Sequence, residues 1–485
     1  MKKGILLAIS SLPSPYGIGT FGKEGYLFCD FLKKSGQSLW QILPIGVTSF
    51  GDSPYQSPSN FAINPYFIDL DLLCEQGFLK KEEYENIDFG DGKSVDYEKL
   101  YNNRKKVLST AFERFTQERA YNGFCRVNSY WLNSYALFMS LKDYHGGKSW
   151  QEWEERYKFR KREELRLFEN SHKKEIEYYK KEQYFAFSQW KSLKKYANSQ
   201  GIEIIGDMPI YASLDSHDVW QNPKRFLLNS DLSPKMVAGV PPDGFTPDGQ
   251  LWGNPLYNWE WEEKRNFSGW IKRIKWQAKL FDSVRIDHFR GFDAFFAIPN
   301  GKHPKNGKWI KAPGKKLFDA VKKNVDISII AEDLGLITKS VRKLLKQTGF
   351  PNMKVMQFGF DGDLTHEYLP ENYPENCIAY TGTHDNDTTQ SWYNSLYGEK
   401  KKFVDGYVNN SANPVFALIE KLFKSKAKMA IIPMQDYLLQ GAESRMNTPG
   451  KNGGNWTYRI NKDVLTNRFL IRAIKDLSTR RWDND

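Results

Sequence analysis

Short apolar runs recur along the chain, and each ends at a glycine, a proline or an acidic residue, with helix-patterned sequence between them. Eight of these runs are predicted to be strands: Ile5–Ile9, Leu39–Leu43, Ile202–Ile205, Ser283–Ile286, Ile327–Ala331, Lys354–Phe358, Cys377–Tyr380 and Met429–Ile432. The carboxylates that end the fourth and fifth runs are 45 residues apart, and the next two intervals span roughly 25 residues each, so each interval has room for one helix. Eight such units predict a single (β/α)8 barrel domain over residues 1–485, rather than a doubly wound sheet.

Two intervals are too long for one crossover and predict insertions. Residues 72–200, between the second and third strands, have apolar positions at helical spacing, which predicts a mainly helical insertion. Residues 211–280 form a loop-rich insertion whose centre, Pro241–Gly253, combines prolines and glycines with the large aromatics Phe245 and Trp252. Long loops of this kind are usually functional or disordered, and the aromatics argue against disorder.

Composition narrows the class of protein. The chain has 70 Lys and Arg against 58 Asp and Glu, a formal net charge of +12. Mixed Lys/Glu segments such as residues 154–181 indicate that this excess is spread over a solvated surface, so no nucleic-acid partner is expected. No apolar stretch approaches the ~18 residues of a membrane span, and the first run is too short for a signal peptide, so we expect a cytoplasmic protein. The four cysteines form no CxxC pair and the seven histidines no zinc-ligand spacing, so neither disulfides nor a metal site are expected.

Four carboxylates, Asp207, Asp287, Glu332 and Asp385, lie at or just beyond predicted strand ends. The C-terminal ends of barrel strands converge on one face, where the active sites of such barrels lie. Each acid alone could simply cap the following helix, but four on one face predict a catalytic cluster. Arg285 is two residues from Asp287, so both side chains face the same way along the strand. We expect its charge to lower the pKa of Asp287 and to keep this carboxylate ionised.

An ionised carboxylate opposite a protonated one is the arrangement that retaining glycosidases use. A metal site is the competing interpretation of clustered acids, and the neighbouring Arg285 disfavours it. Aromatic residues in Gly/Pro-rich context, Tyr55, Phe245, Trp252 and Trp259, would suit the apolar faces of sugars. Burial in a core explains any one of them equally well.

Three long motifs contain these acids: VRIDHFRG at residues 284–291, AEDLG at 331–335 and TGTHDND at 381–387. They resemble the central motifs of bacterial and plant 4-α-glucanotransferases, the amylomaltases or disproportionating enzymes of glycoside hydrolase family 77 in the α-amylase clan. Further matches lie at residues 51–57, 64–66, 206–210, 241–259 and 455–456. The resemblance therefore runs from Leu12 to Trp456.

The resemblance implies an interrupted (β/α)8 barrel without a separate C-terminal β domain. It implies that Asp287 is the nucleophile, Glu332 the acid/base and Asp385 the stabiliser of the transition state. It also implies a set of polar and aromatic side chains that bind substrate: Ser53, Tyr55, Asp207, Gln250, Trp252, Arg285, His288 and His384. No metal or organic cofactor is expected, because two carboxyl groups and positioning supply the catalysis.

The activity implied is transfer of a segment of an α-1,4-glucan to the 4-hydroxyl of another glucan or of glucose, with two inversions and net retention. The expected partners are α-1,4-glucans and maltooligosaccharides, and the expected state is a monomer or weak homo-oligomer. A retaining α-glucan hydrolase would use the same machinery and differ only in its acceptor. A catalytically silent glucan-binding protein would need the aromatics but not three acids. Exclusion of water by the Pro241–Gly253 loop would favour transfer over hydrolysis.

Overall fold

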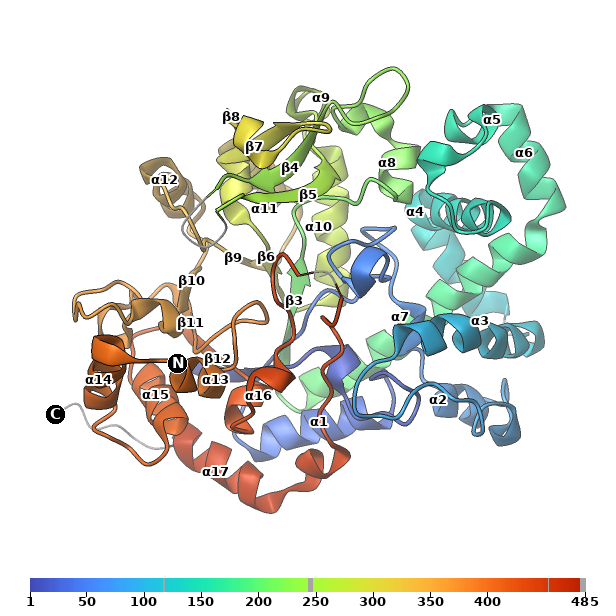
Figure 1. Ribbon diagram of the computed structural model, residues 1–485. Helices are drawn as coiled ribbons and strands as arrows, with labels where there is room; N and C mark the ends of the chain where they lie inside the picture. The colour runs from blue at the N-terminus through green and yellow to red at the C-terminus, as the bar shows by residue number, and fades with distance from the viewer. Residues whose placement is uncertain (117, 243–246, 452, 480–485) are drawn as a thin grey trace.

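A closed barrel of eight parallel strands forms the centre of the molecule in the computed structural model, which describes residues 1–116, 118–242, 247–451 and 453–479 (Figure 1). The strands follow one another around the barrel in the order β1-β12-β11-β10-β9-β6-β3-β2. Their bounds are β1 Lys2–Leu6, β2 Leu39–Gln41, β3 Glu203–Met208, β6 Ser283–Ile286, β9 Ser328–Ala331, β10 Asn352–Val355, β11 Cys377–Tyr380 and β12 Met429–Pro433.

The predicted barrel and all eight of its strands are confirmed, but two strands are shifted along the chain. The first begins at Lys2 and ends at Leu6, because the apolar residues up to Ile9 run into a 3-10 turn, Ile9–Ser11. These residues are buried, so core packing rather than strand pairing explains why they are apolar. The sixth strand ends at Val355, and Met356–Gly359 is again a 3-10 turn.

Amphipathic helices surround the barrel, and α12 (Lys339–Thr348) shows how the sequence selects them. Val341, Leu344 and Thr348 lie on one face of this helix and are buried, whereas its lysines and Arg342 are exposed. The Thr338 side chain caps the N-terminus by accepting from the Val341 amide. Other helices around the barrel are α1 Lys23–Lys34, α10 Ser268–Leu280, α11 Gly314–Asn324, α13 Thr389–Asn394, α14 Gly398–Tyr407, α15 Pro414–Phe423, α16 Met434–Tyr437 and α17 Arg468–Thr479.

Helices dominate the stretch between β2 and β3. They are α2 Leu70–Glu75, α3 Tyr97–Arg114, α4 Glu118–Tyr144, α5 Glu155–Lys158, α6 Arg162–Ser171 and α7 Lys173–Ser199. Stacked aromatics join them, as where Phe112 of α3 and Phe185 of α7 lie 5.3 Å apart between ring centroids. Helix α7 also packs against α1 and β3, so it joins this helical layer to the barrel. No helix in the described ranges has the length and apolar character needed to cross a bilayer.

A second, four-stranded antiparallel sheet is not predicted by the sequence. Its order is β5-β4-β7-β8, with β4 Met236–Val240, β5 Gln250–Pro255, β7 Ala294–Pro299 and β8 Lys308–Lys311. Helices α8 (His217–Gln221) and α9 (Trp259–Glu263) flank β4 and β5 in sequence, so the segment expected to be loop-rich contains regular structure. The interval between β6 and β9, for which the spacing predicts one helix, contains β7, β8 and α11.

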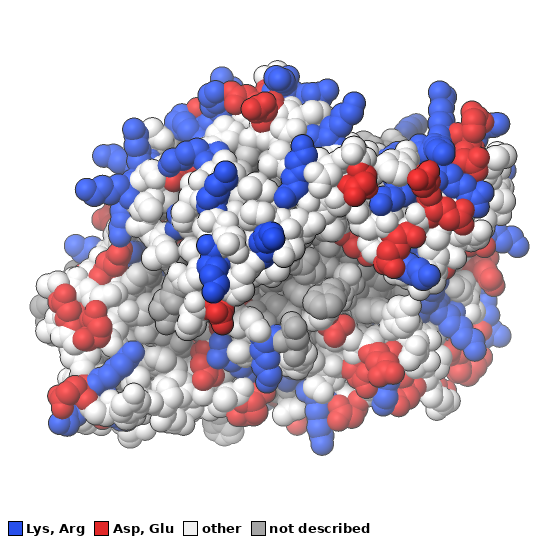
Figure 2. All heavy atoms as spheres, turned by 45° about the horizontal axis from the view of Figure 1, so that its top comes forward, with Lys and Arg blue, Asp and Glu red and all other residues white. Residues whose placement is uncertain are grey.

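The apolar pattern of these strands conceals the sheet. One face packs Phe295 and Ala297 against the main core, whereas the other carries a separate small cluster of Val237, Phe296 and Ile298. Because both faces are buried, the strands lack the alternation of apolar and polar residues that marks a strand in sequence. Beyond this sheet, Figure 2 shows Lys and Arg side chains gathered on the same side of the molecule.

Gly206 tests how tightly the barrel strands are packed. A Cβ there would lie 2.1 Å from the Phe281 ring, so Gly206→Ala must push the ring or strand β3 aside. We expect this variant to lower the free energy of unfolding by about 1–3 kcal/mol in a urea titration. The matched control is Gly123→Ala in α4, where nothing lies within 4 Å, which should be neutral or raise it by about 0.5–1 kcal/mol. Equal stability of the two variants would contradict this account of β3.

Candidate active site

A cavity of about 250 Å³ opens where the barrel strands end. Seven of the eleven residues predicted for the site line it: Ser53, Tyr55, Gln250, Trp252, Asp287, His384 and Asp385. The other four, Asp207, Arg285, His288 and Glu332, are linked to these residues by hydrogen bonds or ring contacts. The structure therefore brings the whole predicted set to one place.

Arg285 connects two of the strand-end carboxylates. Its Nη1 donates to both oxygens of Asp207, at 2.8 and 2.6 Å, and its Nη2 donates to Asp287 Oδ1 at 2.9 Å. Asp207 and Arg285 are register partners on the adjacent strands β3 and β6, so the barrel itself sets this contact. Arg285 and Asp207 are almost fully buried, while the Asp287 side chain keeps 29% of its surface exposed.

Tyr55 adds a second partner to this network. Its hydroxyl donates to Asp207 Oδ2 at 2.7 Å and lies 2.9 Å from His384 Nε2. The Tyr55 ring is stacked on His384, with 5.5 Å between centroids, and Trp456 lies beside both rings. Ser53 acts locally, where its Oγ accepts from the Tyr55 amide. Aromatic surface and a tyrosine hydroxyl therefore meet on one wall of the cavity.

Glu332 is held by backbone amides. Its Oε2 accepts from the His288 amide at 2.6 Å, and its Oε1 accepts from the Leu334 amide at 2.7 Å. His288 has a left-handed backbone, with φ of 50°, which turns the chain after Asp287 so that its amide meets Glu332. The Glu332 amide in turn donates to the Ile286 carbonyl, which joins the ends of β6 and β9.

The two carboxyl groups have different acidities. Burial and the nearby charge of Asp287 raise the pKa of Glu332 to about 8. Burial also raises the pKa of Asp287, to about 6, although Arg285 lowers it. The expectation that Arg285 would keep this pKa low is wrong in its net direction, because burial outweighs the guanidinium. At neutral pH Asp287 is still mainly ionised and Glu332 mainly protonated.

Asp385 stays the most acidic of the three. Burial raises its pKa, but His384 and Asn447 more than offset this and the net shift is downward. His384 Nε2 lies 3.2 Å from Asp385 Oδ2, and Asn447 Nδ2 donates to Oδ1 at 2.6 Å. Arg445 donates to the Asp385 carbonyl at 2.6 Å. Sequence reasoning missed Arg445 and Asn447, which lie in a segment without regular structure whose only signal was the nearby Asn455-Trp456 match.

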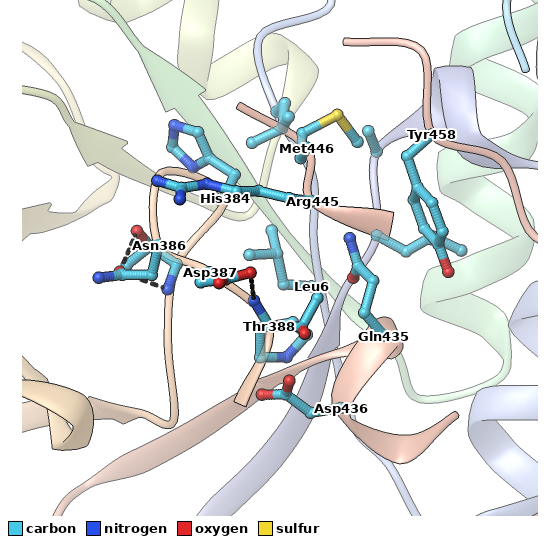
Figure 3. Close-up of a pocket in the computed structure, with 15 residues that line it drawn as sticks. Leu6, His384, Asn386, Asp387, Thr388, Gln435, Asp436, Arg445, Met446 and Tyr458 are labelled. Atoms are coloured by element: carbon cyan, nitrogen blue, oxygen red, sulfur yellow. Dashed lines mark hydrogen bonds between the residues drawn. The ribbon is translucent and has the colours of Figure 1, made fainter. Parts of the chain in front are cut away.

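Figure 3 shows a smaller cavity, of about 20 Å³, on the inner side of the loop that carries His384 and Asp385. Beneath it Asp436 accepts from the Thr381 hydroxyl at 2.5 Å and from the amide and hydroxyl of Thr389, both at 2.7 Å. The loop is thus fixed at both of its ends to one buried carboxylate, and this limits how far Asp385 can move.

Trp252 covers His288 on the opposite wall. The two rings meet edge to face at 4.9 Å, and Trp252 Nε1 donates to Gln250 Oε1 at 2.9 Å. Burial lowers the pKa of His288 to about 3, so the ring is neutral. Its Nε2 is buried and has no hydrogen-bond partner among the described residues. Phe245, predicted for the same loop, lies outside the described residues.

Within the described ranges, no group of three or more His, Cys, Asp or Glu side chains is arranged to hold a metal ion. Asp287 and Asp207 instead share a guanidinium. A carboxylate with an ionised arginine, a protonated carboxyl and a third anionic carboxylate at one cavity are the groups needed for acid/base and nucleophilic chemistry at an acetal.

Comparison with known proteins agrees with this site. The family model described as 4-alpha-glucanotransferase matches residues 7–466. The 4-alpha-glucanotransferase of Clostridium butyricum is 49% identical, over 96% of this chain and 98% of that protein. That of Streptococcus pneumoniae is 44% identical, over 99% and 97%. The solved amylomaltase from Streptococcus agalactiae, in complex with acarbose, superposes with a TM-score of 0.96 at 42% identity, covering 99% of this chain and 98% of that one. The chain therefore belongs to the 4-alpha-glucanotransferase family, glycoside hydrolase family 77.

Proposed function

We propose that this protein transfers a segment of an α-1,4-glucan to the 4-hydroxyl of an acceptor glucan or glucose, by a retaining double displacement. The observation that carries the proposal is the pair of carboxyl groups on neighbouring strand ends, of which one is ionised and the other protonated at neutral pH. Membership of the 4-alpha-glucanotransferase family supports the choice of substrate and acceptor.

In the first half-reaction, an Asp287 oxygen attacks the anomeric carbon of the donor while Glu332 gives its proton to the departing glycosidic oxygen. The bond between the anomeric carbon and that oxygen breaks, and the glucan leaves with a free 4-hydroxyl. Arg285 holds Asp287 by one carboxylate oxygen, which leaves the other available for attack. The product is a glycosyl ester on Asp287.

In the second half-reaction, the now ionised Glu332 takes the proton of the acceptor 4-hydroxyl. The acceptor oxygen attacks the anomeric carbon from the face that the leaving group vacated, and Asp287 departs as a carboxylate. Two inversions restore the original configuration, and no proton is gained or lost overall. The amides of His288 and Leu334 stabilise the ionised form of Glu332 during this step.

Asp385 is the remaining anion of the site. Held by His384 and Asn447, it stays ionised throughout, so it can stabilise the positive charge that develops on the sugar ring in both transition states. We assign Arg445 and Asn447 as positioning residues, because they fix Asp385 through its carbonyl and carboxylate. Tyr55 and Trp252 offer aromatic surface to the sugar rings, and Ser53, Gln250 and His288 offer polar groups near them.

The proposal is tested first with maltotriose alone. Transfer should yield a ladder of longer oligosaccharides together with glucose, whereas hydrolysis yields only shorter products. Asp287→Asn should abolish the ladder, because the amide cannot form the glycosyl ester. Size-resolved product analysis checks both statements, with circular dichroism to show that the variant is folded. Full disproportionation by Asp287→Asn would contradict the assignment of the nucleophile.

The rate of transfer should depend on pH as a bell. It should rise through about 6, as Asp287 loses its proton, and fall through about 8, as Glu332 loses its own. The profile is measured as kcat/KM for maltotriose. In Glu332→Gln, with a glycosyl fluoride donor whose leaving group needs no proton, fluoride release in a single turnover should lose the alkaline limb. Persistence of that limb near 8 in Glu332→Gln would assign it to another group.

Trp252 should govern the choice between acceptor and water. If its indole covers the intermediate, Trp252→Ala should raise hydrolysis relative to transfer while Tm changes little. If Trp252 only fills the rim, the variant should lose about 3–5 kcal/mol of stability and both reactions should decline together. Leu251→Ala is the control, because Leu251 neighbours Trp252 on β5 and is exposed. A product ratio that stays constant at every acceptor concentration would exclude the covering role.

A further inference from the structure

The positive charge of the chain is concentrated in one short segment. Residues 302–346 carry twelve lysine and arginine side chains against four carboxylates, a net of +8 out of the +12 of the whole chain. All twelve cationic residues are exposed, whereas Glu332 and Asp333 are buried, so the surface balance is more basic still. The expectation of an evenly spread excess is therefore wrong for this part of the surface.

The segment forms one continuous face, which we call the basic face: β8, α11, α12 and the turns that join them. Helices α11 and α12 pack against each other, and Lys322 of α11 donates to the Thr348 carbonyl at the end of α12. Figure 2 shows Lys and Arg crowded at the upper left, on the side where Figure 1 places β8 and α12, with few acidic side chains among them.

Many of these cations have no acidic partner. Lys311, Lys315, Lys316 and Arg342 are paired with carboxylates. The remainder that form no ion pair with a described residue are Lys302, Lys305, Lys308, Lys322, Lys323, Lys339, Lys343 and Lys346. On α12, Lys339, Lys343 and Lys346 share one side of the helix at spacings of four and three residues, where like charges repel and destabilise a helix. An anionic ligand would relieve this repulsion.

An exposed tryptophan lies on the same face. Trp309 of β8 keeps 37% of its surface exposed, and the Arg290 guanidinium lies over its ring, 3.6 Å from the centroid. Arg290 also donates to the Leu336 carbonyl. Because Arg290 follows Asp287 by three residues and Leu336 follows Glu332 by four, Trp309 adjoins the loops that carry the candidate nucleophile and acid.

We infer that the basic face binds α-glucan that carries phosphate monoesters, and so holds such polymers beside the active site. This inference rests on the proposed function. A neutral glucan would gain nothing from unpaired lysines, whereas a phosphate ester supplies the missing anions and the sugar ring supplies an apolar face for Trp309. The position of Trp309 behind the acid side of the cleft makes the polymer substrate the anion with access to both.

Protection of a sheet edge and attraction of nucleic acid each account for only part of the face. Lysines on an edge strand prevent sheets from pairing edge to edge, which explains Lys308 and Lys311 of β8 but not the helices. Nucleic acid would also be attracted by the charge, but eleven of the twelve cations are lysines, and the bidentate recognition of phosphate that favours arginine is absent from them. We therefore treat nucleic acid as an outcome of the experiment.

The experiment compares one amylopectin sample of known phosphate content with the same sample after phosphatase, by affinity electrophoresis at low and high salt. The wild type should bind the phosphorylated polymer roughly tenfold more tightly, and high salt should remove the difference. A variant in which Lys308, Lys339, Lys343 and Lys346 are all changed to Gln should bind both samples alike. These four side chains make no ion pair with a described residue and contact no candidate catalytic group, so maltotriose disproportionation should be unchanged.

The matched control changes four exposed lysines of α3 and α7 to Gln: Lys106, Lys173, Lys191 and Lys195. It removes the same charge, and it should keep the preference for phosphorylated polymer. Equal binding of both samples by the wild type, or an equal loss in both variants, would overturn the inference. Preferential binding of duplex DNA in competition with the phosphorylated polymer would overturn it in favour of nucleic acid. Loss of maltotriose disproportionation by the wild type would contradict the proposed function instead, and the electrophoresis would still report on the face.

Discussion

The ion pairs of Arg285 organise the candidate site. A buried guanidinium is costly unless carboxylates surround it, and here Asp207 and Asp287 both pair with it from the ends of β3 and β6. The barrel brings Asp207 and Arg285 into register, so the closure of the fold and the geometry of the site are one constraint. Tyr55 then donates to Asp207 and contacts His384, which links the segments that follow β2 and β11 to the same charge.

Around this centre, environment rather than residue type distinguishes the carboxyl groups. Glu332 is buried beside an anion and is held by two amides, which leaves it protonated near neutral pH. Asp385 is also enclosed, but the imidazole of His384 and the amide of Asn447 keep it ionised. Asp287 lies between these extremes, because burial and Arg285 act in opposite directions. Acid, nucleophile and stabilising anion thus arise from three side chains of similar intrinsic acidity.

The sequence predicts the barrel and its acids because both depend on local patterns: a buried parallel strand reads as a short apolar run, and the polar residue that ends it is easily seen. Strands β4, β5, β7 and β8 escape prediction because apolar residues on both faces of their sheet remove any alternation. Asn447 and Arg445 are missed because they reach Asp385 from about 60 residues away, through tertiary packing alone. The net pKa of Asp287 is missed for a similar reason, since burial cannot be counted from neighbours in sequence.

The small sheet joins the two surfaces that a polymeric substrate would meet. Its edge strand β5 carries Gln250 and Trp252 into the cavity, and its opposite edge strand β8 carries Trp309 and lysines onto the basic face. Strand β7, between them, continues directly from the turn that begins at Asp287 and His288. A displacement at either edge would therefore be transmitted through a rigid hydrogen-bonded sheet to the residues beside the candidate nucleophile. Insertion of this sheet between barrel strands places a wall of the cleft and an outer face of the molecule on a single element.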